Sequence, residues 1–456
     1  MSKQSLKVPP NNTDAEQSVL GAILIDKDSI IKVADLITPS DFYLPAHEKI
    51  FQIILELFEK RQPIDILSVT SRLKEANLLQ EVGGSSYIAD LTNQVPTSAH
   101  IENYAKIVKE KKTLRDLIKA SAEITEDVFG GTDEVEDLLD SIEQKIFAIS
   151  QKSTPQNFVH IKDELKTAYE RIERLHQGDG AIRGVPTGFK GIDNLLSGLQ
   201  KSDLIIIGAR PSLGKTAFSL DIARYASLKA GIPVGYFSIE MSREQVIDRL
   251  ISSESQVSLW KLRTGRISDD MEFEMIQYAL DRLSKAPLFI DDTPSPTLLQ
   301  MRAMARRLQI EHGLGLIVVD YLQLIQPRTK SDNMVNQVTE ISRGLKALAR
   351  ELKVPVLALS QLSRAVDQRD HKQPRLSDLR ESGSIEQDSD VVLFIYRKDK
   401  DRTDIEAPLE EQNVAQIIVA KHRNGPLGTV KFKFDSERVC FHEIEDRFGD
   451  APAGEM

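Results

Sequence analysis

A phosphate-binding loop, ARPSLGKT at residues 209–216, is the first feature of the sequence that could carry chemistry. In such a loop, backbone N–H groups and the first turn of the following helix bind phosphate oxygens. The amine of Lys215 would reach the outer phosphates, and the hydroxyl of Thr216 would hold Mg²⁺. Ala209 stands where the pattern usually has glycine, which costs little if its φ stays negative. We expect a nucleoside triphosphate to bind at Ser212, Gly214, Lys215, Thr216 and Ala217.

Carboxylates follow two apolar runs that read as buried strands. Glu240 comes directly after residues 233–239, and Asp320 comes directly after LIVV at 316–319. A carboxylate beside a phosphate loop can orient and deprotonate the attacking water, which is the role we expect for Glu240. Asp320 has the form of the carboxylate that supports Mg²⁺ together with Thr216. Either residue, taken alone, could instead cap a helix or a turn.

An amide and two cations follow later strand patterns. Gln361 lies just after the run 354–359, where its side chain could donate to a γ-phosphate and accept from a neighbouring loop. Lys421 and Arg423 lie just after the run 414–420 and suit the stabilisation of charge on a γ-phosphate in the transition state. They would act in cis on the nucleotide of this chain, or in trans on that of a neighbouring subunit. A solvated basic turn is the alternative.

The elements that must position these residues are strands alternating with helices, beginning at about residue 186. This alternation predicts an α/β domain with a mostly parallel sheet. Its apolar, β-rich runs are 204–207, 233–239, 288–290, 316–319, 354–359, 391–396 and 414–420. Two further runs, 429–434 and 438–444, predict an antiparallel hairpin at the sheet edge. Ligands of open α/β sheets bind at the carboxyl ends of the strands, so we expect the site there.

The first part of the chain reads as an all-helical domain that lacks catalytic spacing, so an interaction or assembly role is expected. Its first helix pattern begins near Asp14 and Gln17, which have the spacing of a capping box. A polar linker with one amphipathic helix, at about 162–177, has no core of its own and should pack on another domain or subunit. The expected divisions are the helical domain 1–150, the linker 151–185, the α/β domain 186–445 and a tail 446–456.

Composition excludes several classes of protein. The chain has 456 residues, of which 41% are hydrophobic and 28% charged, and no apolar stretch is long enough to span a membrane. Its single cysteine excludes a zinc site made of cysteine pairs. The N-terminus lacks a signal-peptide pattern, so a cytoplasmic location is expected. The net charge of −10 argues against broad coating of nucleic acid but permits a small basic surface.

Together the motifs closely resemble the DnaB family of bacterial replicative DNA helicases. The motifs that carry the resemblance are TGFKGIDNLLSGLQKSDLIIIGARPSLGKTA, FSIEMS, LIVVDYLQLI, SQLSR, DLRESGSIEQDSDVVLFIYR and AKHRNGPLG. DAEQSVLGAIL and ADLTNQVPTSAHIENYAKIVKEKK resemble the helical N-terminal domain of that family, and residues 151–182 resemble its linker. The resemblance covers nearly the whole chain, and the ordered set is far more specific than any one motif.

The resemblance implies a homohexameric ring of RecA-like domains that encircles single-stranded DNA, moves 5′ to 3′ and unwinds the duplex ahead. ATP and Mg²⁺ would bind between neighbouring subunits, and the N-terminal domain would form a collar that docks primase. A helicase loader is a further implied partner, and the replication fork is the implied place of action. By motif, Gln361 would sense the γ-phosphate, while Lys421 and Arg423 would serve the nucleotide of the neighbouring subunit.

The resemblance also assigns residues that their spacing alone does not. Arg380, Glu381 and Gly383 match the loop that contacts the DNA backbone, and Arg249 lies where the family contacts nucleotide. The long polar segment 363–390, which contains the proposed DNA loop, has no obvious row of aromatic residues for stacking on bases. Backbone contact, tolerant of sequence and sensitive to salt, is therefore expected.

Two other functions share parts of this pattern. A RecA-like recombinase shares the ATPase core, but the helical N-terminal domain and the RESGSIEQ segment argue against it. A nucleotide-gated assembly or loader ATPase would bind ATP without unwinding DNA. Glu240 and Arg423 argue against a protein that only binds ATP, because such a protein needs neither a base nor a cation for the transition state.

Overall fold

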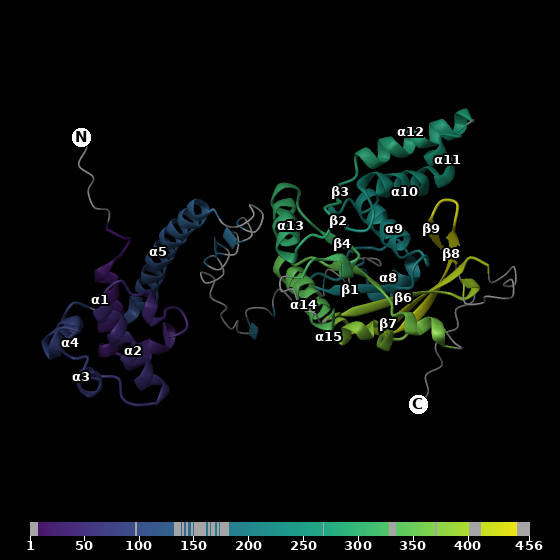
Figure 1. Cartoon of the computed structure of the whole chain (residues 1–456). Coiled ribbons are helices and arrows are strands. Elements are labelled where there is room, and N and C mark those ends of the chain that lie inside the picture. Colours follow the sequence, from purple (N-terminus) through teal and green to yellow (C-terminus); the bar gives the residue numbers. More distant parts are fainter. Residues whose placement is uncertain are drawn as a thin grey trace, which may run out of the picture. The chain divides into compact units, whose positions relative to one another are not determined.

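The computed structural model divides the chain into two compact units, residues 1–166 and 167–456, which are described separately (Figure 1). It describes residues 8–95, 98–131, 182–267, 269–327, 334–369, 372–400 and 412–444, with a few isolated residues between 138 and 173. The expected linker helix at 162–177 lies largely outside the described residues, as does the helix pattern at 133–150, and the tail 446–456 lies wholly outside them.

The described part of the N-terminal unit is all-helical, as the sequence predicts. Its helices are α1 (Thr13–Ile25), α2 (Pro45–Glu59), α3 (Ile66–Glu75), α4 (Gly84–Asn93) and α5 (Ile101–Gly130), with 3₁₀ helices η1 (Lys27–Lys32), η2 (Pro39–Asp41) and η3 (Ser98–His100). Helix α1 packs tightly on α4, because a Cβ on Gly21 would lie 2.1 Å from the carbonyl oxygen of Leu91. The predicted capping box is wrong: Asn12 caps α1 by accepting from the N–H of Ala15 at 3.0 Å.

The C-terminal unit is built on one nine-stranded sheet. The strands are β1 (Leu204–Ala209), β2 (Val234–Ser238), β3 (Leu288–Asp291), β4 (Leu316–Asp320), β5 (Val356–Gln361), β6 (Val391–Arg397), β7 (Val414–His422), β8 (Gly428–Asp435) and β9 (Cys440–Glu443). They lie in the order β3-β2-β4-β5-β1-β6-β7-β8-β9. The first six in this order are parallel, and the β8–β9 hairpin is antiparallel at the edge, as predicted.

Strand β7 corrects one expectation from the sequence. The sequence pattern predicts residues 414–420 as one of the parallel strands, but β7 runs antiparallel to β6. His422 at its end pairs with Val391 at the start of β6. The carboxyl end of β7 therefore lies at the sheet edge where the parallel strands begin. Residues that follow β7 therefore lie at the amino-terminal ends of the parallel strands, whereas those that follow β1, β2, β4 and β5 lie at the carboxyl ends.

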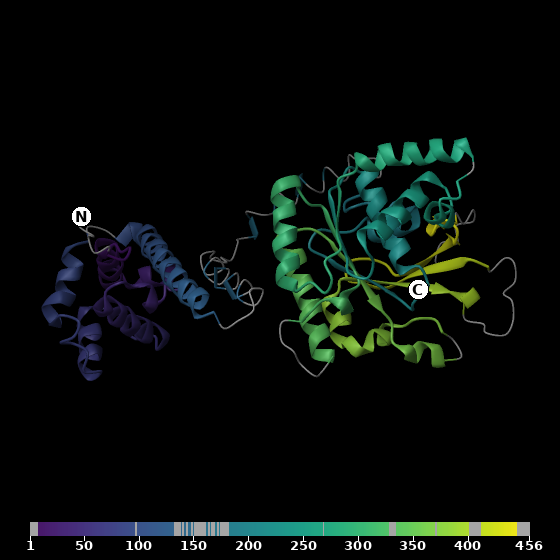
Figure 2. The ribbon, with the colours of Figure 1, turned by 45° about the horizontal axis from the view of Figure 1, so that its top comes forward.

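Helices cover both faces of the sheet. They are α8 (Lys190–Leu196), α9 (Lys215–Leu228), α10 (Arg243–Ser255), α11 (Leu259–Thr264), α12 (Asp270–Ser284), α13 (Leu298–His312), α14 (Met334–Leu352) and α15 (Gly383–Asp388); the 3₁₀ helices are η4 (Leu322–Leu324), η5 (Arg364–Gln368), η6 (Leu376–Ser382) and η7 (Lys398–Lys400). Helices α13 and α14 lie on the face opposite to α9 and α10 (Figures 1 and 2). Within the described residues, none of the helices has the length and the apolar run that a membrane crossing requires.

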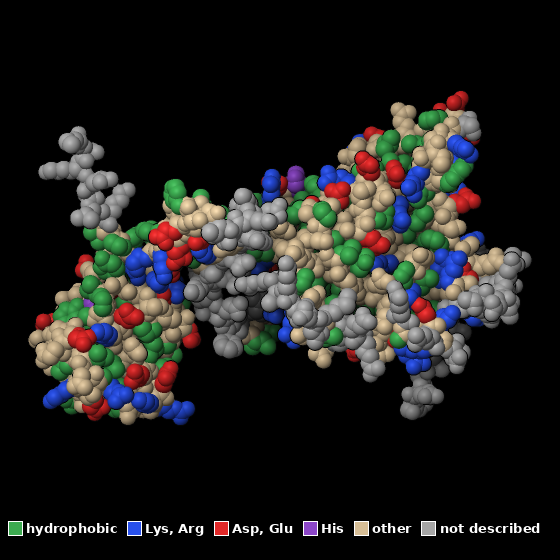
Figure 3. Space-filling model, viewed as in Figure 1, with side chains coloured by type: hydrophobic (Ala, Val, Ile, Leu, Met, Phe, Trp, Pro, Cys, Tyr) green, Lys and Arg blue, Asp and Glu red, His purple; other side chains and the backbone are tan. Residues whose placement is uncertain are grey.

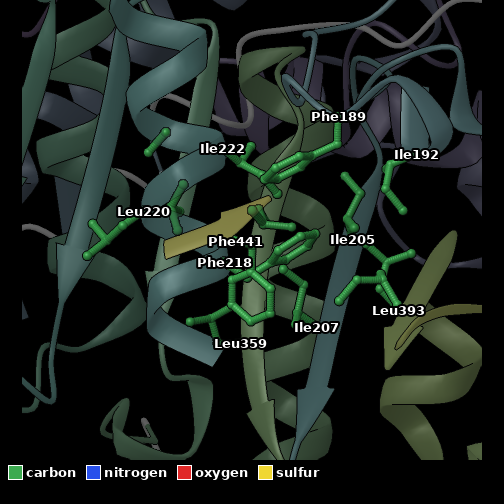
Figure 4. Close-up of a cluster of buried hydrophobic side chains, with 14 of the residues drawn as sticks. Phe189, Ile192, Ile205, Ile207, Phe218, Leu220, Ile222, Leu359, Leu393 and Phe441 are labelled. Carbon is green, nitrogen blue, oxygen red and sulfur yellow. The ribbon is translucent and has the colours of Figure 1, made fainter. Parts of the chain in front are cut away.

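The two faces of β1 bury alternate side chains, as expected of a central strand. Ile205 and Ile207 join the core beneath α9, where Figure 4 shows them with Phe218. Leu204 and Ile206 join the core beneath α14 on the other face. Strand β1 is thus packed on both faces. This packing positions the phosphate loop, which begins where the strand ends.

Candidate functional site

The phosphate loop connects β1 directly to α9. Ala209 is the buried last residue of β1, so the missing glycine of the pattern causes no strain there. Gly214, just before α9, has a φ of 98°, and a Cβ on it would lie 2.8 Å from the Phe441 ring. Glycine is therefore required at this position on two grounds. Ser212 also has a positive φ, at 65°, and Lys215 starts the helix, so the loop turns its backbone toward the helix N-terminus.

Lys215 lies against two residues that follow one another at the end of β4. Its Nζ is 3.8 Å from Oδ1 of Asp320 and 3.9 Å from the centre of the Tyr321 ring. Burial lowers the pKa of Lys215, while the negative charges of Asp320 and Glu240 oppose this shift. The amine is thus held between a carboxylate and an aromatic face, close to where the phosphates of a nucleotide would bind.

Asp320 is a fully buried carboxyl group, and one of its two oxygens has no hydrogen bond among the described residues. Its Oδ2 accepts from the hydroxyl of Tyr236 at 3.4 Å, while Oδ1 has no hydrogen-bond partner among the described residues. Burial raises the pKa of Asp320, opposed by the charge of Lys215 and by the nearby hydroxyl of Thr216. A buried oxygen that has the Lys215 ammonium 3.8 Å away but no hydrogen bond calls for an explanation. Because Mg²⁺ takes oxygen ligands, this carboxylate with the Thr216 hydroxyl beside it fits a magnesium site.

The end of β2 is tied to the end of β4. The backbone N–H groups of Ile239 and Glu240 donate to the carbonyl oxygen of Asp320 at 2.9 and 3.2 Å. The exposed Glu240 is close enough to Asp320 to add to the rise in its pKa. Arg249 of α10 belongs to the same group: burial lowers its pKa, and the charges of Asp320 and Glu240 oppose that shift. Arg249 therefore lies within electrostatic reach of the two carboxylates.

Gln361 ends β5 beside the phosphate loop, where it pairs with Ala209 in the register of β1 and β5. The side chain of Gln323 bonds to the backbone of Gln361. From the loop itself, Arg210 donates to the carbonyl oxygen of Leu362 at 2.8 Å and pairs with Asp367. The ends of β1, β2, β4 and β5 thus meet at one edge of the sheet.

Lys421 and Arg423 lie at the other edge. Lys421 donates to the carbonyl oxygens of Ser389, at 2.7 Å, and Glu386, while Arg423 donates to that of Gln387 at 2.6 Å. Burial lowers the pKa of Lys421, and the positive charge of Arg423 lowers it further. These cations sit at the C-terminal end of α15, so the structure does not bring them to the phosphate loop of their own chain. An action in cis has no support in this geometry.

The three residues matched to DNA contact lie where η6 passes into α15. Arg380 and Glu381 are in η6, and Gly383 is the first residue of α15. Their backbone is described, and their side chains lie outside the description. Helix α15 is the same short helix whose last carbonyl groups bond to Lys421 and Arg423. The proposed DNA loop thus leads into the helix to which the two cations bond.

Four contributors to the site were missed in the sequence: Arg210, Tyr236, Tyr321 and Gln323. Arg210 could have been suspected from its place inside the phosphate loop, and Tyr321 and Gln323 from the DYLQ run that begins at Asp320. Tyr236 gave no signal, because a tyrosine inside an apolar strand reads as an ordinary core residue. Its hydroxyl in fact bonds to Ser219 at 2.9 Å as well as to Asp320.

Charge on the visible surface is mixed. Among the described residues on the face shown in Figure 3, lysine and arginine side chains alternate with acidic ones on both units. This agrees with the acidic net charge of the chain. On the face that Figure 3 shows, the described residues form no broad basic area that could hold nucleic acid.

Two family models match the chain. The model described as the DnaB-like helicase N terminal domain matches residues 8–110, and that of the DnaB-like helicase C terminal domain matches residues 184–443. The second match contains the phosphate loop, the carboxylates, Gln361 and the two cations. The first match covers most of the described helical unit.

Known proteins resemble the chain over nearly its full length. The replicative DNA helicase DnaB of Geobacillus stearothermophilus is 46% identical over 448 residues, which cover 98% of each chain. The replicative DNA helicase DnaC of Bacillus subtilis (strain 168) is 46% identical over 98% of this chain and 97% of its own. A solved DnaB-like replicative helicase, reported with its interactions with primase, has a TM-score of 0.76 at 33% identity and covers 95% of this chain and 100% of its own. A second solved structure, that of an isolated ATPase domain, has a TM-score of 0.59 at 38% identity, covering 63% of this chain and 100% of its own.

Proposed function

Because the chain belongs to the DnaB-like replicative DNA helicases, which are ATP-dependent enzymes, we propose that it works as a homohexameric ring. The ring encloses single-stranded DNA, moves along it 5′ to 3′ and unwinds the duplex at the replication fork, in the cytoplasm. One observation carries this proposal. The phosphate loop and the cations Lys421 and Arg423 lie at opposite edges of the sheet, so a complete site needs a neighbouring subunit.

In the proposed site, the loop N–H groups and the N-terminus of α9 bind the phosphates of ATP. Lys215 contacts the outer phosphates, and Arg249 contacts the same nucleotide. Glu240 accepts the proton of the attacking water, and Gln361 contacts the γ-phosphate. Ser212, Gly214 and Ala217 complete the loop that surrounds the phosphate groups.

Oδ1 of Asp320, which has no hydrogen bond among the described residues, and the hydroxyl of Thr216 would hold Mg²⁺. The ion supplies positive charge to the phosphate oxygens when it is bound. Lys421 and Arg423 of a neighbouring subunit add charge at the γ-phosphate, and each ring interface thereby uses residues of two chains. Hydrolysis then depends on the interface being closed.

Arg380, Glu381 and Gly383 would follow the DNA backbone inside the ring. Contacts to phosphate carry no base information, so the motor can pass over any sequence. A small number of contacts in each subunit, repeated around a ring, is enough for an acidic chain. Binding should accordingly weaken as salt is added.

The helical domain, residues 1–150, would form the collar of the ring and dock primase, and the linker 151–185 would pack on an adjacent subunit. A solved relative was reported with its interactions with primase, which supports primase as a partner of this chain. A helicase loader would open or assemble the ring on DNA. The recombinase and loader alternatives are disfavoured, because both family models that match are those of helicases.

Light scattering with and without an ATP analogue, followed by unwinding of a forked duplex, tests this proposal. We expect a species of about six times the 51.1 kDa chain mass and ATP turnover stimulated by single-stranded DNA. Unwinding should require a 5′ single-stranded arm. A stable monomer whose ATPase ignores DNA would overturn the ring.

A further inference from the structure

The last residues of β5 extend beyond the end of the neighbouring strand β4, and a side chain binds their backbone there. The paired residues of β4 and β5 end at Val319 and Ala358. Strand β5 nevertheless continues through Ser360 to Gln361, which faces the phosphate loop from its other side. Something other than a β4 backbone must therefore satisfy the side of β5 that faces β4 over these last residues.

Gln323 supplies those bonds. Its Oε1 accepts from the N–H of Gln361 at 3.3 Å, and its Nε2 donates to the carbonyl oxygen of Gln361 at 3.2 Å. The same Nε2 donates to Oγ of Ser360 at 3.0 Å. The side-chain amide of Gln323 thus both donates a hydrogen bond to the backbone of Gln361 and accepts one from it, as the backbone of a neighbouring strand would. A carboxylate could only accept, and an alanine could do neither.

The opposite side of this peptide segment is fixed by the phosphate loop. Gln361 pairs with Ala209, the N–H of Leu362 donates to the carbonyl oxygen of Ala209 at 3.1 Å, and Arg210 holds the carbonyl oxygen of Leu362. The side chain of Gln361 therefore projects from a backbone clamped on two sides. Gln323 provides one of the two clamps.

Gln323 also ties this clamp to the proposed magnesium carboxylate. It lies in η4, three residues after Asp320 and two after Tyr321, whose ring contacts Lys215. The Gln323 amide therefore links the end of β4 to Gln361, beyond the point where the backbones of β4 and β5 pair.

We infer that Gln323 is a positioning residue that aims Gln361 at the γ-phosphate. This inference rests on the proposed role of Gln361. It predicts that loss of the amide lowers the affinity for ligands that have a γ-phosphate and leaves the affinity for ligands without one unchanged. A residue that merely supports the fold would affect both alike.

The test compares Gln323→Glu and Gln323→Ala with the wild-type ring. The first is nearly isosteric and keeps an acceptor but loses the donor, so it guards against a packing defect in the second. In both variants we expect kcat to fall about tenfold and affinity for a non-hydrolysable ATP analogue to fall by a similar factor, with ADP affinity within about twofold of wild type. Gln309→Ala is the matched control. Gln309 of α13 also donates to a backbone carbonyl oxygen, at 2.9 Å, but its acceptor is Leu352, the last residue of α14.

Gln361→Ala separates failure of the inference from failure of the proposed site. If Gln361→Ala loses the preference for the ATP analogue while both Gln323 variants keep it, Gln361 has its role and Gln323 does not position it. If Gln361→Ala behaves as wild type, the role of Gln361 itself is wrong. Equal loss of ADP and analogue binding in Gln323→Glu would mean a general structural role and would overturn the inference.

Discussion

Arg423 and Lys215 lie at opposite ends of the same strand. The guanidinium of Arg423 is 3.4 Å from Oδ1 of Asp390, and Oδ2 of that carboxylate accepts from the N–H of Leu204, where β1 begins. Lys215 follows the loop that starts where β1 ends. At about 3.3 Å per residue, the six-residue strand separates its two ends by roughly 17 Å. A nucleotide at Lys215 is therefore served by another chain's Arg423 or by none.

Mixed rings test this separation directly. Arg423→Ala and Lys215→Ala should each abolish DNA-stimulated ATPase activity while the ring persists. Mixing the two proteins at equal amounts should restore activity at about one quarter of the interfaces, because an intact interface needs an unaltered residue from each of two neighbours. The measurement is ATPase rate after subunit exchange has been demonstrated with labelled chains.

A chain that carries both substitutions is the control for that experiment. Mixed with Lys215→Ala, it offers no interface with both residues intact and should stay inactive. Failure of the two single variants to complement one another, with exchange proven, would contradict the assignment in trans.

Lys215 and Glu240 should fail in different ways. Lys215→Ala removes the amine that contacts the phosphates, so nucleotide binding itself should be lost. Glu240→Gln keeps the shape and removes the base, so binding should persist while hydrolysis falls by about a hundredfold or more. Binding of a fluorescent ATP analogue and single-turnover hydrolysis distinguish the two. Wild-type hydrolysis in Glu240→Gln would remove Glu240 as the base.

Cys440 gives a pH dependence that can be measured. Burial, with the nearby charges of Asp221 and Asp435, raises the pKa of its thiol from 9.0 to about 12. Since the thiolate is the reactive form, alkylation of the native chain near pH 8 should be about a thousandfold slower than that of the unfolded chain. Native labelling at the unfolded rate would contradict the shift.

The same thiol affects stability at alkaline pH. Above pH 9 the unfolded chain loses this proton while the folded chain keeps it, so the unfolded state binds fewer protons and the free energy of unfolding falls. The contribution is complete below pH 9 and is lost as the pH rises through about 12. Cys440→Ala, which has nothing to titrate, should therefore show a shallower fall in melting temperature over this range.

The sequence predicts most of the α/β unit because its signals are local. Each buried strand of the parallel region appears as an apolar run, and Glu240, Asp320 and Gln361 follow three of these runs. Parallel order then places all three at one edge of the sheet. The phosphate loop needed only its own spacing, and its altered first position, Ala209, proved harmless because it ends a strand.

The local sequence pattern does not predict the direction of β7. A strand pattern at residues 414–420 reads the same in either direction, and only the connection before it carries the answer. A parallel neighbour of β6 would need a crossover, usually a helix, and residues 398–413 have no helical pattern. The role of Gln323, by contrast, depends on which strand ends meet in space, and no pattern in the sequence states it.

Arg380→Ala tests the contact with DNA. Arg380 lies in η6 and is not among the residues proposed to contact the nucleotide, so its loss should leave basal ATPase and ring mass unchanged while DNA affinity and DNA stimulation fall. Each phosphate contact to a single strand contributes about 0.7 to the slope of log affinity against log salt, so the slope should also flatten. Arg307→Ala removes the same charge from an exposed helix, where Arg307 pairs only with Glu311 among the described ion pairs, and should leave both quantities as in wild type. If the two variants lose DNA affinity equally, overall charge rather than the segment around Arg380 holds the strand.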